Sequence, residues 1–379
     1  MNYLILHRKT PMNKVRHVLG ISGGKDSAAL AIYLNEKYPQ LDIEYYFCDT
    51  GRELDETYVL VEKLETILNK KIERLSSVDD SPYDAPFDHY LEIYGGYLPS
   101  TQSRWCTRKL KLEPFEKFVG DDPVISYVGI RGDENREAYI SRKPNIQSIF
   151  PFRKNIWSKD VIAKVLSNQS ISVIAELYLQ HAPADKKDTI IEMVRRSITP
   201  EFDLDQKLNA LLEADITSLN RVIFEYLRHT EYPLSLVDNY PLLENTDILV
   251  RDDIFRILEE SGVGIPKYYQ PVEFNVNDQT GQYARTRSGC FFCFFQQKIE
   301  WVWLYEQHPE LFEKAMAYEK DGYTWIQEES LQILIKPDRI RKIKEEHLKR
   351  LSQLKNTKSD KLLDILEDDN EQGCAACFI

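Results

Sequence analysis

A glycine-rich hexapeptide between a strand pattern and a helix pattern is the feature that most constrains this chain. Residues 17–21 (HVLGI) are apolar, residues 22–27 read SGGKDS, and residues 27–38 have helical spacing. A tight turn from a strand into a helix presents backbone N–H groups and the positive end of the helix dipole to an anion. We therefore predict that residues 22–27, called the phosphate loop below, bind phosphate groups.

The residue types of the phosphate loop suit this role. The glycines let the backbone approach phosphate oxygens, the serines add hydroxyl donors, and the lysine adds a positive charge. The aspartate is unusual in an anion site unless it helps to hold a cation, so we assign it to Mg²⁺. The alternative is a glycine-rich turn without a ligand; a Walker A motif is excluded, because it would need glycine at Leu19 and serine or threonine at Asp26. The predicted ligand residues are Ser22, Gly23, Gly24, Lys25, Asp26 and Ser27.

Strand and helix patterns alternate over the first 130 residues. Residues 43–50, 71–77 and 123–130 predict further strands, and residues 53–69 predict a helix. This alternation predicts an α/β fold with a doubly wound parallel sheet, covered by helices on both faces. Ligands of such sheets bind beyond the carboxyl ends of the strands. We therefore add Asp49, Thr50 and Gly51, which end the second strand, to the predicted binding site. Asp49 is a second candidate Mg²⁺ ligand or, alternatively, a helix cap.

The sequence pattern divides the chain into four parts. Residues 1–156 form the α/β core, and residues 157–240 show successive helical patterns, which predict a helical insertion. Residues 241–330 continue the core and hold a C-x-x-C motif. Residues 331–379 form a helical tail that ends in a second C-x-x-C motif.

Composition narrows the function classes. The 379-residue chain carries a formal net charge of −12, so a surface that binds nucleic acid over its whole extent is not expected. No apolar run approaches the roughly 18 residues that a membrane span needs, and the first residues lack the pattern of a signal peptide. We predict a cytoplasmic protein without membrane partners.

Six cysteines, four of them in C-x-x-C pairs, predict metal, iron–sulfur or redox chemistry rather than a disulfide framework. Cys48 lies in an apolar run and is expected to be a buried small hydrophobic residue. Phenylalanines surround Cys290 and Cys293, and an apolar shell shelters a metal or a cluster from water. A zinc site that adds Cys374 and Cys377 is an alternative, and so is a site without metal.

These motifs together resemble a known family. SGGKDS matches the SGGxDS motif of the PP-loop ATP pyrophosphatases, and within that superfamily the chain resembles the phosphoadenosine-phosphosulfate (PAPS) reductase family. The resemblance covers about residues 15–152 and 240–320. Besides the phosphate loop, it rests on Asp49-Thr50-Gly51 with Glu53 and Thr57-Tyr58, Arg104-Trp105-Cys106-Thr107 with Lys111 and Pro114, Gly129-Ile130-Arg131 with Asp133, Glu134 and Arg136, and Ser288-Gly289-Cys290 with Cys293.

The resemblance implies a fold like that of the adenine nucleotide alpha hydrolases and an enzyme that uses ATP and Mg²⁺. Such an enzyme adenylates an acceptor with release of pyrophosphate, and sulfur transfer to the acceptor then releases AMP. We assign Lys25, Asp26 and Arg131 as catalytic residues. Arg136 is a further nucleotide ligand, because it follows the strand at 123–130 together with Arg131.

Two features favour ATP chemistry over sulfonucleotide reduction. True sulfonucleotide reductases have a degenerate phosphate loop and a nucleophilic cysteine in a C-terminal E-C-G-x-H segment. This chain keeps the complete loop, and Gln372-Gly373-Cys374 is not followed by histidine. A PAPS or adenylylsulfate reductase stays the first alternative. A non-catalytic nucleotide-sensing subunit of a defence complex is the second.

The family resemblance also extends to the cysteines. Cys106 lies in a segment that resembles the paired-cysteine segment of the iron–sulfur adenylylsulfate reductases, with Thr107 in place of the second cysteine. This implies a [4Fe–4S] cluster on Cys106 and the internal C-x-x-C pair, with an open iron or with Cys374 or Cys377 as the fourth ligand. The pattern most resembles the sulfur-transfer subunits of DNA phosphorothioation and related phage-defence systems. That implies protein partners at the insertion and tail, and a nucleic-acid substrate presented by a complex.

Overall fold

The computed structural model describes residues 14–78, 81–134, 141, 143–320, 322–327 and 329–355. Five parallel strands form its central sheet: β1 (Arg16–Gly20), β2 (Ile43–Cys48), β3 (Ile72–Leu75), β4 (Val124–Tyr127) and β5 (Ile146–Ile149). Their order is β3-β2-β1-β4-β5, so the direction of strand addition reverses at β1. Leu19 of β1 is level with Tyr45 on one side and Tyr127 on the other. The carboxyl end of β1, at the reversal point, is where such sheets bind ligands.

Helices cover both faces of this sheet. The helices of the first part are α1 (Lys25–Lys37), α2 (Asp55–Leu68), α3 (Pro86–Ile93), α4 (Trp105–Thr107), the π-helix η1 (Arg108–Leu112) and α5 (Glu113–Val119). Successive residues of a strand point to opposite faces. Leu19 therefore packs in the core that includes residues of α1 and α2, whereas Val18 packs with Phe115 and Val119 of α5. The predicted α/β fold with a doubly wound parallel sheet is confirmed.

The segment after β5 is helical. It comprises α6 (Lys159–Val165), η2 (Asn168–Ser170), α7 (Ile171–His181), α8 (Lys187–Arg195), α9 (Leu204–Ala214), α10 (Ile216–Leu227), η3 (Pro233–Leu236) and η4 (Pro241–Glu244). Trp157, Ile174 and Val222 of this segment belong to the same apolar cluster as Leu19 of the sheet. The predicted strands do not include β5, because four residues reading Ile-Gln-Ser-Ile are too short to show a periodic pattern.

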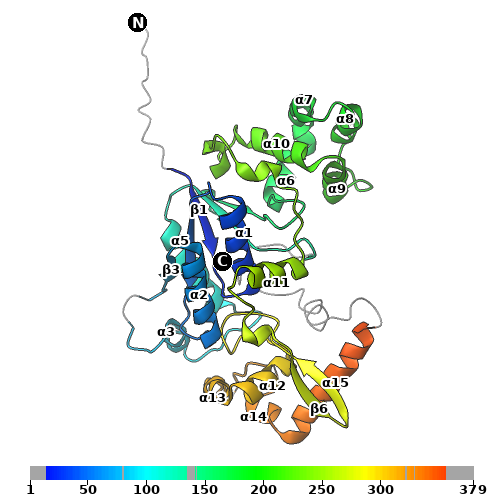
Figure 1. Cartoon of the computed structure of the whole chain (residues 1–379). Coiled ribbons are helices and arrows are strands. Elements are labelled where there is room, and N and C mark those ends of the chain that lie inside the picture. The colour runs from blue at the N-terminus through cyan, green and yellow to red at the C-terminus, as the bar shows by residue number, and fades with distance from the viewer. Residues whose placement is uncertain are drawn as a thin grey trace.

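The C-terminal part packs around a second apolar core. Its elements are η5 (Lys267–Tyr269), β6 (Val272–Val276), β7 (Gln279–Tyr283), α12 (Lys298–Gln307), α13 (Pro309–Ala317), α14 (Leu331–Leu334) and α15 (Pro337–Lys355). Phe292, Trp301 and Trp325 lie in this core. Helix α11 (Arg251–Glu260), which precedes these elements, packs in the first core through Ile254 and Leu258. Figure 1 shows the sheet between the helices α7 to α10 at the top and the helices α12 to α15 at the bottom. The β6–β7 hairpin is absent from the sequence prediction; its turn residues, Asn277 and Asp278, both have positive φ, as a type I′ turn requires.

None of the helices in the described ranges is long and apolar enough to cross a bilayer.

His17 of β1 generates a prediction about stability. Its Nδ1 lies 2.8 Å from the hydroxyl of Tyr127, and burial lowers the pKa of His17 to about 4. The ordinary pKa of histidine, 6.5, applies to the unfolded chain. At pH values between about 4 and 6.5, His17 is therefore protonated in the unfolded chain but not in the folded protein, so the free energy of unfolding falls as the pH drops. From pH 7 to pH 5 we expect His17 to contribute a loss of about 2 kcal/mol.

Urea unfolding at the two pH values measures this loss. The variant His17→Gln lacks the titrating ring, so its stability should fall less than that of the wild type over the same interval. Equal losses in the two proteins would contradict the prediction.

Candidate nucleotide and cysteine site

The phosphate loop closes on itself between β1 and α1. The backbone N–H of Ser22 donates to Ser27 Oγ at 3.1 Å, and this hydroxyl donates to the carbonyl of Gly24 at 3.2 Å. Gly23 has a φ of +75°, which a residue with a side chain rarely adopts. Gly24 precedes α1 and offers no capping side chain. The positive end of α1 therefore faces the loop, as the predicted phosphate site requires.

Lys25 and Asp26 lie in the first turn of α1 and are both buried. The ammonium group of Lys25 is 4.9 Å from the ring centre of Tyr269 and 3.4 Å from Asp26 Oδ2. Asp26 Oδ1 accepts a hydrogen bond of 3.0 Å from Arg131 Nη1. A Mg²⁺ ion at Asp26 would therefore share this carboxylate with two cations, and the assignment of Asp26 to Mg²⁺ stays a prediction.

Arg131 follows β4 and is buried beside the phosphate loop. Besides Asp26, its guanidinium pairs with Asp133 at 2.9 Å and with Glu134 at 3.0 Å. Three carboxylates thus fix the orientation of this side chain, and its predicted catalytic role stays a prediction. Arg136, the other predicted arginine ligand, lies outside the described residues.

The loop after β2 contains the other predicted nucleotide ligands. Asp49 Oδ1 accepts hydrogen bonds from the backbone N–H of Gly51 at 2.8 Å and from the hydroxyl of Tyr58 at 3.0 Å. Asp49 therefore shapes this turn, and its role toward Mg²⁺ stays a prediction. Thr50 is buried, and its hydroxyl donates to Glu53 Oε1 at 2.7 Å and lies 3.2 Å from Cys290 Sγ.

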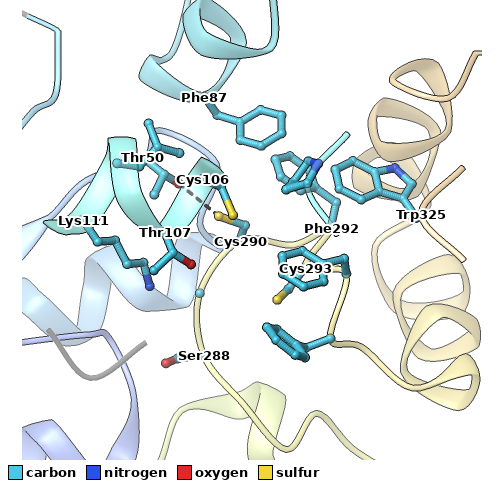
Figure 2. A pocket seen from close by; sticks show the side chains of 15 residues that line it. Thr50, Phe87, Cys106, Thr107, Lys111, Ser288, Cys290, Phe292, Cys293 and Trp325 are labelled. Carbon is cyan, nitrogen blue, oxygen red and sulfur yellow. Dashed lines mark hydrogen bonds between the residues drawn. The ribbon is translucent and has the colours of Figure 1, made fainter. Parts of the chain in front are cut away.

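Three of the predicted metal ligands line one pocket. Figure 2 shows Cys106, from α4, beside Cys290 and Cys293, which come from a loop almost 190 positions later in the chain. We call this space the cysteine pocket. Its lining residues are Thr50, Phe87, Pro99, Cys106, Thr107, Leu110, Lys111, Ser288, Gly289, Cys290, Phe292, Cys293, Phe294, Phe295 and Trp325. Aromatic rings thus surround the thiols, as the sequence predicts.

Metal ligation itself stays a prediction. Within the described ranges, no group of three or more His, Cys, Asp or Glu side chains is arranged to hold a metal ion. The two candidates for a fourth ligand, Cys374 and Cys377, lie outside these ranges. Three thiols in an apolar shell are nevertheless a donor set that suits an iron–sulfur cluster.

The Cys290 thiol differs from an ordinary surface cysteine in its pKa. Burial, assisted by the nearby carboxyl of Glu53, raises the pKa of Cys290. Burial, assisted by Asp49, also raises the pKa of Glu53. Cys290 is therefore a thiol at neutral pH unless a cation lowers its pKa. Cys48 packs in the core on the α5 face of the sheet, where burial raises its pKa to about 12; the prediction of a buried small residue is confirmed.

The segment that carries the C-x-x-C motif also contacts the phosphate loop. We call residues 285–293 the cysteine segment. Ser288 Oγ donates to the carbonyl of Ser22 at 3.3 Å, and a Cβ atom on Gly24 would lie 2.8 Å from the same hydroxyl oxygen. The backbone N–H of Phe291 donates to the carbonyl of Arg52 at 3.0 Å. The cysteine pocket and the phosphate loop are therefore neighbours with a shared wall.

Some residues of this site have no role in the sequence prediction. The hydroxyl of Tyr268 donates to the carbonyl of Gly23 at 2.6 Å, and Tyr269 lies beside Lys25. No local pattern marks the two tyrosines, because they precede β6 and reach the loop only through the fold. Ser288 precedes the Gly-Cys pair directly, so its position was visible although its contact was not.

Residues 16–182 match the family model of the phosphoadenosine phosphosulfate reductase domain. The chain therefore contains a PAPS reductase domain of the PP-loop superfamily. The matched range includes the five strands of the sheet and extends to the end of α7. The family resemblance stated from the motifs is confirmed over this range.

Curated relatives share only part of their length with this chain. The uncharacterized protein MJ0066 of Methanocaldococcus jannaschii is 34% identical over 154 residues, which are 37% of this chain and 30% of that protein. The uncharacterized protein MJ0973 of the same organism is 28% identical over 160 residues, 39% of this chain and 36% of that protein. The uncharacterized nin region protein ORF290 of Escherichia phage lambda is 28% identical over 156 residues, 35% of this chain and 52% of that protein. The chain thus spans about half or less of each relative, and no solved structure matches it.

The backbone of the phosphate loop yields a second prediction. A Cβ atom on Gly23 would lie 2.3 Å from Thr57 Cγ2, and the positive φ adds backbone strain. We expect Gly23→Ala to lower the free energy of unfolding by roughly 2–4 kcal/mol. Adding Thr57→Ser, which removes the clashing methyl group, should restore part of that loss. Urea unfolding measures both variants.

Gly262 provides a matched control. Its φ of +79° is nearly the same, but a Cβ atom there would meet no other atom within 4 Å. Gly262→Ala therefore reports the backbone strain without the clash. If Gly23→Ala is no less stable than Gly262→Ala, the close approach of Thr57 has no energetic consequence.

Proposed function

We propose that this chain binds ATP with Mg²⁺ at the phosphate loop and adenylates an acceptor with release of pyrophosphate. The observation that carries the proposal is the shared wall between the complete SGGKDS loop and the cysteine pocket, formed by Ser288. The PAPS reductase domain supports nucleotide use, because it places the chain in a nucleotide-binding enzyme family. The neighbouring thiols support a sulfur-transfer step that follows adenylation.

The chemistry needs positioning and charge more than acid–base catalysis. An acceptor oxygen attacks the α-phosphorus of ATP, the bond to the bridging oxygen breaks, and pyrophosphate leaves. The loop amides at the start of α1 and the ammonium group of Lys25 stabilise the negative charge that develops on the leaving group. Mg²⁺ would be held by Asp26 and Asp49 and would neutralise further phosphate charge. A sulfur nucleophile then attacks the activated acceptor, and AMP leaves.

The cysteine pocket would hold the sulfur for the second step. Cys106, Cys290 and Cys293 would ligate a [4Fe–4S] cluster, with Cys374 or Cys377 as a candidate fourth ligand and zinc as the alternative metal. When bound, such a cluster supplies a site that keeps the transferable sulfur close to the nucleotide. The aromatic rings of the pocket exclude water from this site.

The acceptor is proposed to be a nucleic acid presented by partner proteins. The acidic chain, with its net charge of −12, would need a partner to bring a polyanion to the phosphate loop. The helices α6 to α10 and the C-terminal tail are the proposed docking elements. A role in DNA phosphorothioation or phage defence is consistent with this arrangement and is part of the proposal.

Product analysis of labelled ATP tests the reaction type. With an acceptor present, we expect AMP and pyrophosphate, and we expect Lys25→Met to slow their formation about 100-fold. Lys70→Met is the matched control, because Lys70 pairs with Asp42 at the opposite end of the sheet. ADP and phosphate as the products would refute the mechanism. ATP binding without turnover would instead favour a nucleotide-sensing subunit, and turnover of a sulfonucleotide would favour a reductase.

Metal analysis of anaerobically purified variants tests the cysteine pocket. A cluster on Cys106, Cys290 and Cys293 predicts that Cys106→Ser loses most of its iron, whereas Cys48→Ala keeps it because Cys48 lies outside the pocket. A zinc site made by the two C-x-x-C pairs predicts the reverse dependence: Cys374→Ser loses zinc and Cys106→Ser keeps it. Full metal content in Cys106→Ser would therefore remove Cys106 from the ligand set.

A further inference from the structure

Arg285 is the most deeply buried arginine near the two parts of the site. It follows β7 and begins the cysteine segment, and only 1% of its surface is exposed. Its backbone N–H donates to the carbonyl of Tyr268 at 2.9 Å. Its Nη2 donates to the carbonyl of Cys290 at 3.2 Å. Through its backbone and its side chain together, Arg285 therefore connects the segment before β6 to the C-x-x-C motif.

The charge of Arg285 lacks a counter-ion in the described part of the chain. Its Nε and Nη1 have no hydrogen-bond partner there, and no carboxylate lies within ion-pair distance. Arg131 shows the contrast, because it is also buried but pairs with Asp26, Asp133 and Glu134. A buried charge without a counter-ion destabilises the folded state, so such a group is retained where an anion completes the site.

Tyr268 connects this charge to the phosphate loop. The phenol of Tyr268 donates to the carbonyl of Gly23, and the carbonyl of Tyr268 accepts the hydrogen bond from the backbone N–H of Arg285. Burial raises the pKa of Tyr268, and the positive charges of Arg285 and Lys25 both act in the opposite direction. Two cations therefore act on the same phenol, whose hydroxyl contacts the phosphate loop.

We propose that Arg285 is a positioning residue that supplies the uncompensated positive charge for the polyphosphate bound by the phosphate loop. Its hydrogen bond to the Cys290 carbonyl braces the cysteine segment internally. Its backbone hydrogen bond to Tyr268 connects that segment to a side chain that contacts the phosphate loop. The inference rests on the proposed function, since the polyphosphate would be that of ATP. It adds a residue outside the phosphate loop to the anion site and links that site to the thiols.

Isothermal titration calorimetry with two probes, ATP–Mg²⁺ and inorganic pyrophosphate, tests the charge of Arg285. We expect Arg285→Met to bind pyrophosphate about tenfold more weakly than the wild type, because the charge is lost while the volume is kept. Arg285→Lys should recover most of the affinity, since it keeps the charge. Arg256→Met is the matched control: Arg256 is exposed on α11 and pairs with Asp253 and Glu260.

The affinities of the variants show whether the charge of Arg285 or only its packing contributes to anion binding. If Arg285→Lys and Arg285→Met lose the same affinity, or if neither loses any, the proposal is overturned. Should Arg285→Met fail to fold, Arg285→Gln replaces it, and equal pyrophosphate affinities in the Gln and Lys variants would overturn the proposal. If the wild type binds pyrophosphate but not ATP, the proposed nucleotide binding is refuted. The role of Arg285 is then still tested by the pyrophosphate affinities of its variants. A wild type that binds neither probe would overturn both proposals.

Discussion

The contacts of the cysteine segment with two loops at the carboxyl edge of the sheet hold the site together. Ser288 bonds to the phosphate loop, and Phe291 bonds to the backbone at Arg52 in the loop after β2. These partners are more than 230 positions apart in the chain. The nucleotide loop and the thiols therefore become neighbours only when the C-terminal core has docked on the sheet. The proposed chemistry of the site depends on this docking.

The fold of the first part could be predicted because each local signal agrees with the tertiary structure. The apolar run at β1, the glycines after it and the helical spacing of α1 all indicate the same strand–loop–helix unit. β5 and the β6–β7 hairpin could not be predicted with the same signals. β5 has only four residues, and the hairpin turn is Asn277-Asp278 rather than the more informative Asn-Gly.

Residues of the candidate site could be predicted where they belong to a sequence motif. They could not be predicted where only the fold brings them to the site. The phosphate loop and the three cysteines of the pocket belong to short patterns with known chemistry, so the sequence identified them. Tyr268 and Arg285 carry no pattern, because what matters is the buried space in which they sit. The carboxylates around Arg131 are a further case. Asp133 and Glu134 lie close to Arg131 in the sequence, but the sequence could not show that Asp26 is the third carboxylate.

The continuous apolar core between the sheet and the helices α6 to α10 has a consequence for folding. Trp157, Ile174 and Val222 share one buried cluster with Leu19, so the helical segment is not an independent appendage. Its removal would expose the apolar side chains of the sheet that it covers. Unfolding of the sheet and of these helices should then occur in one cooperative transition. The inner face of these helices is therefore constrained by the same packing as the nucleotide-binding sheet.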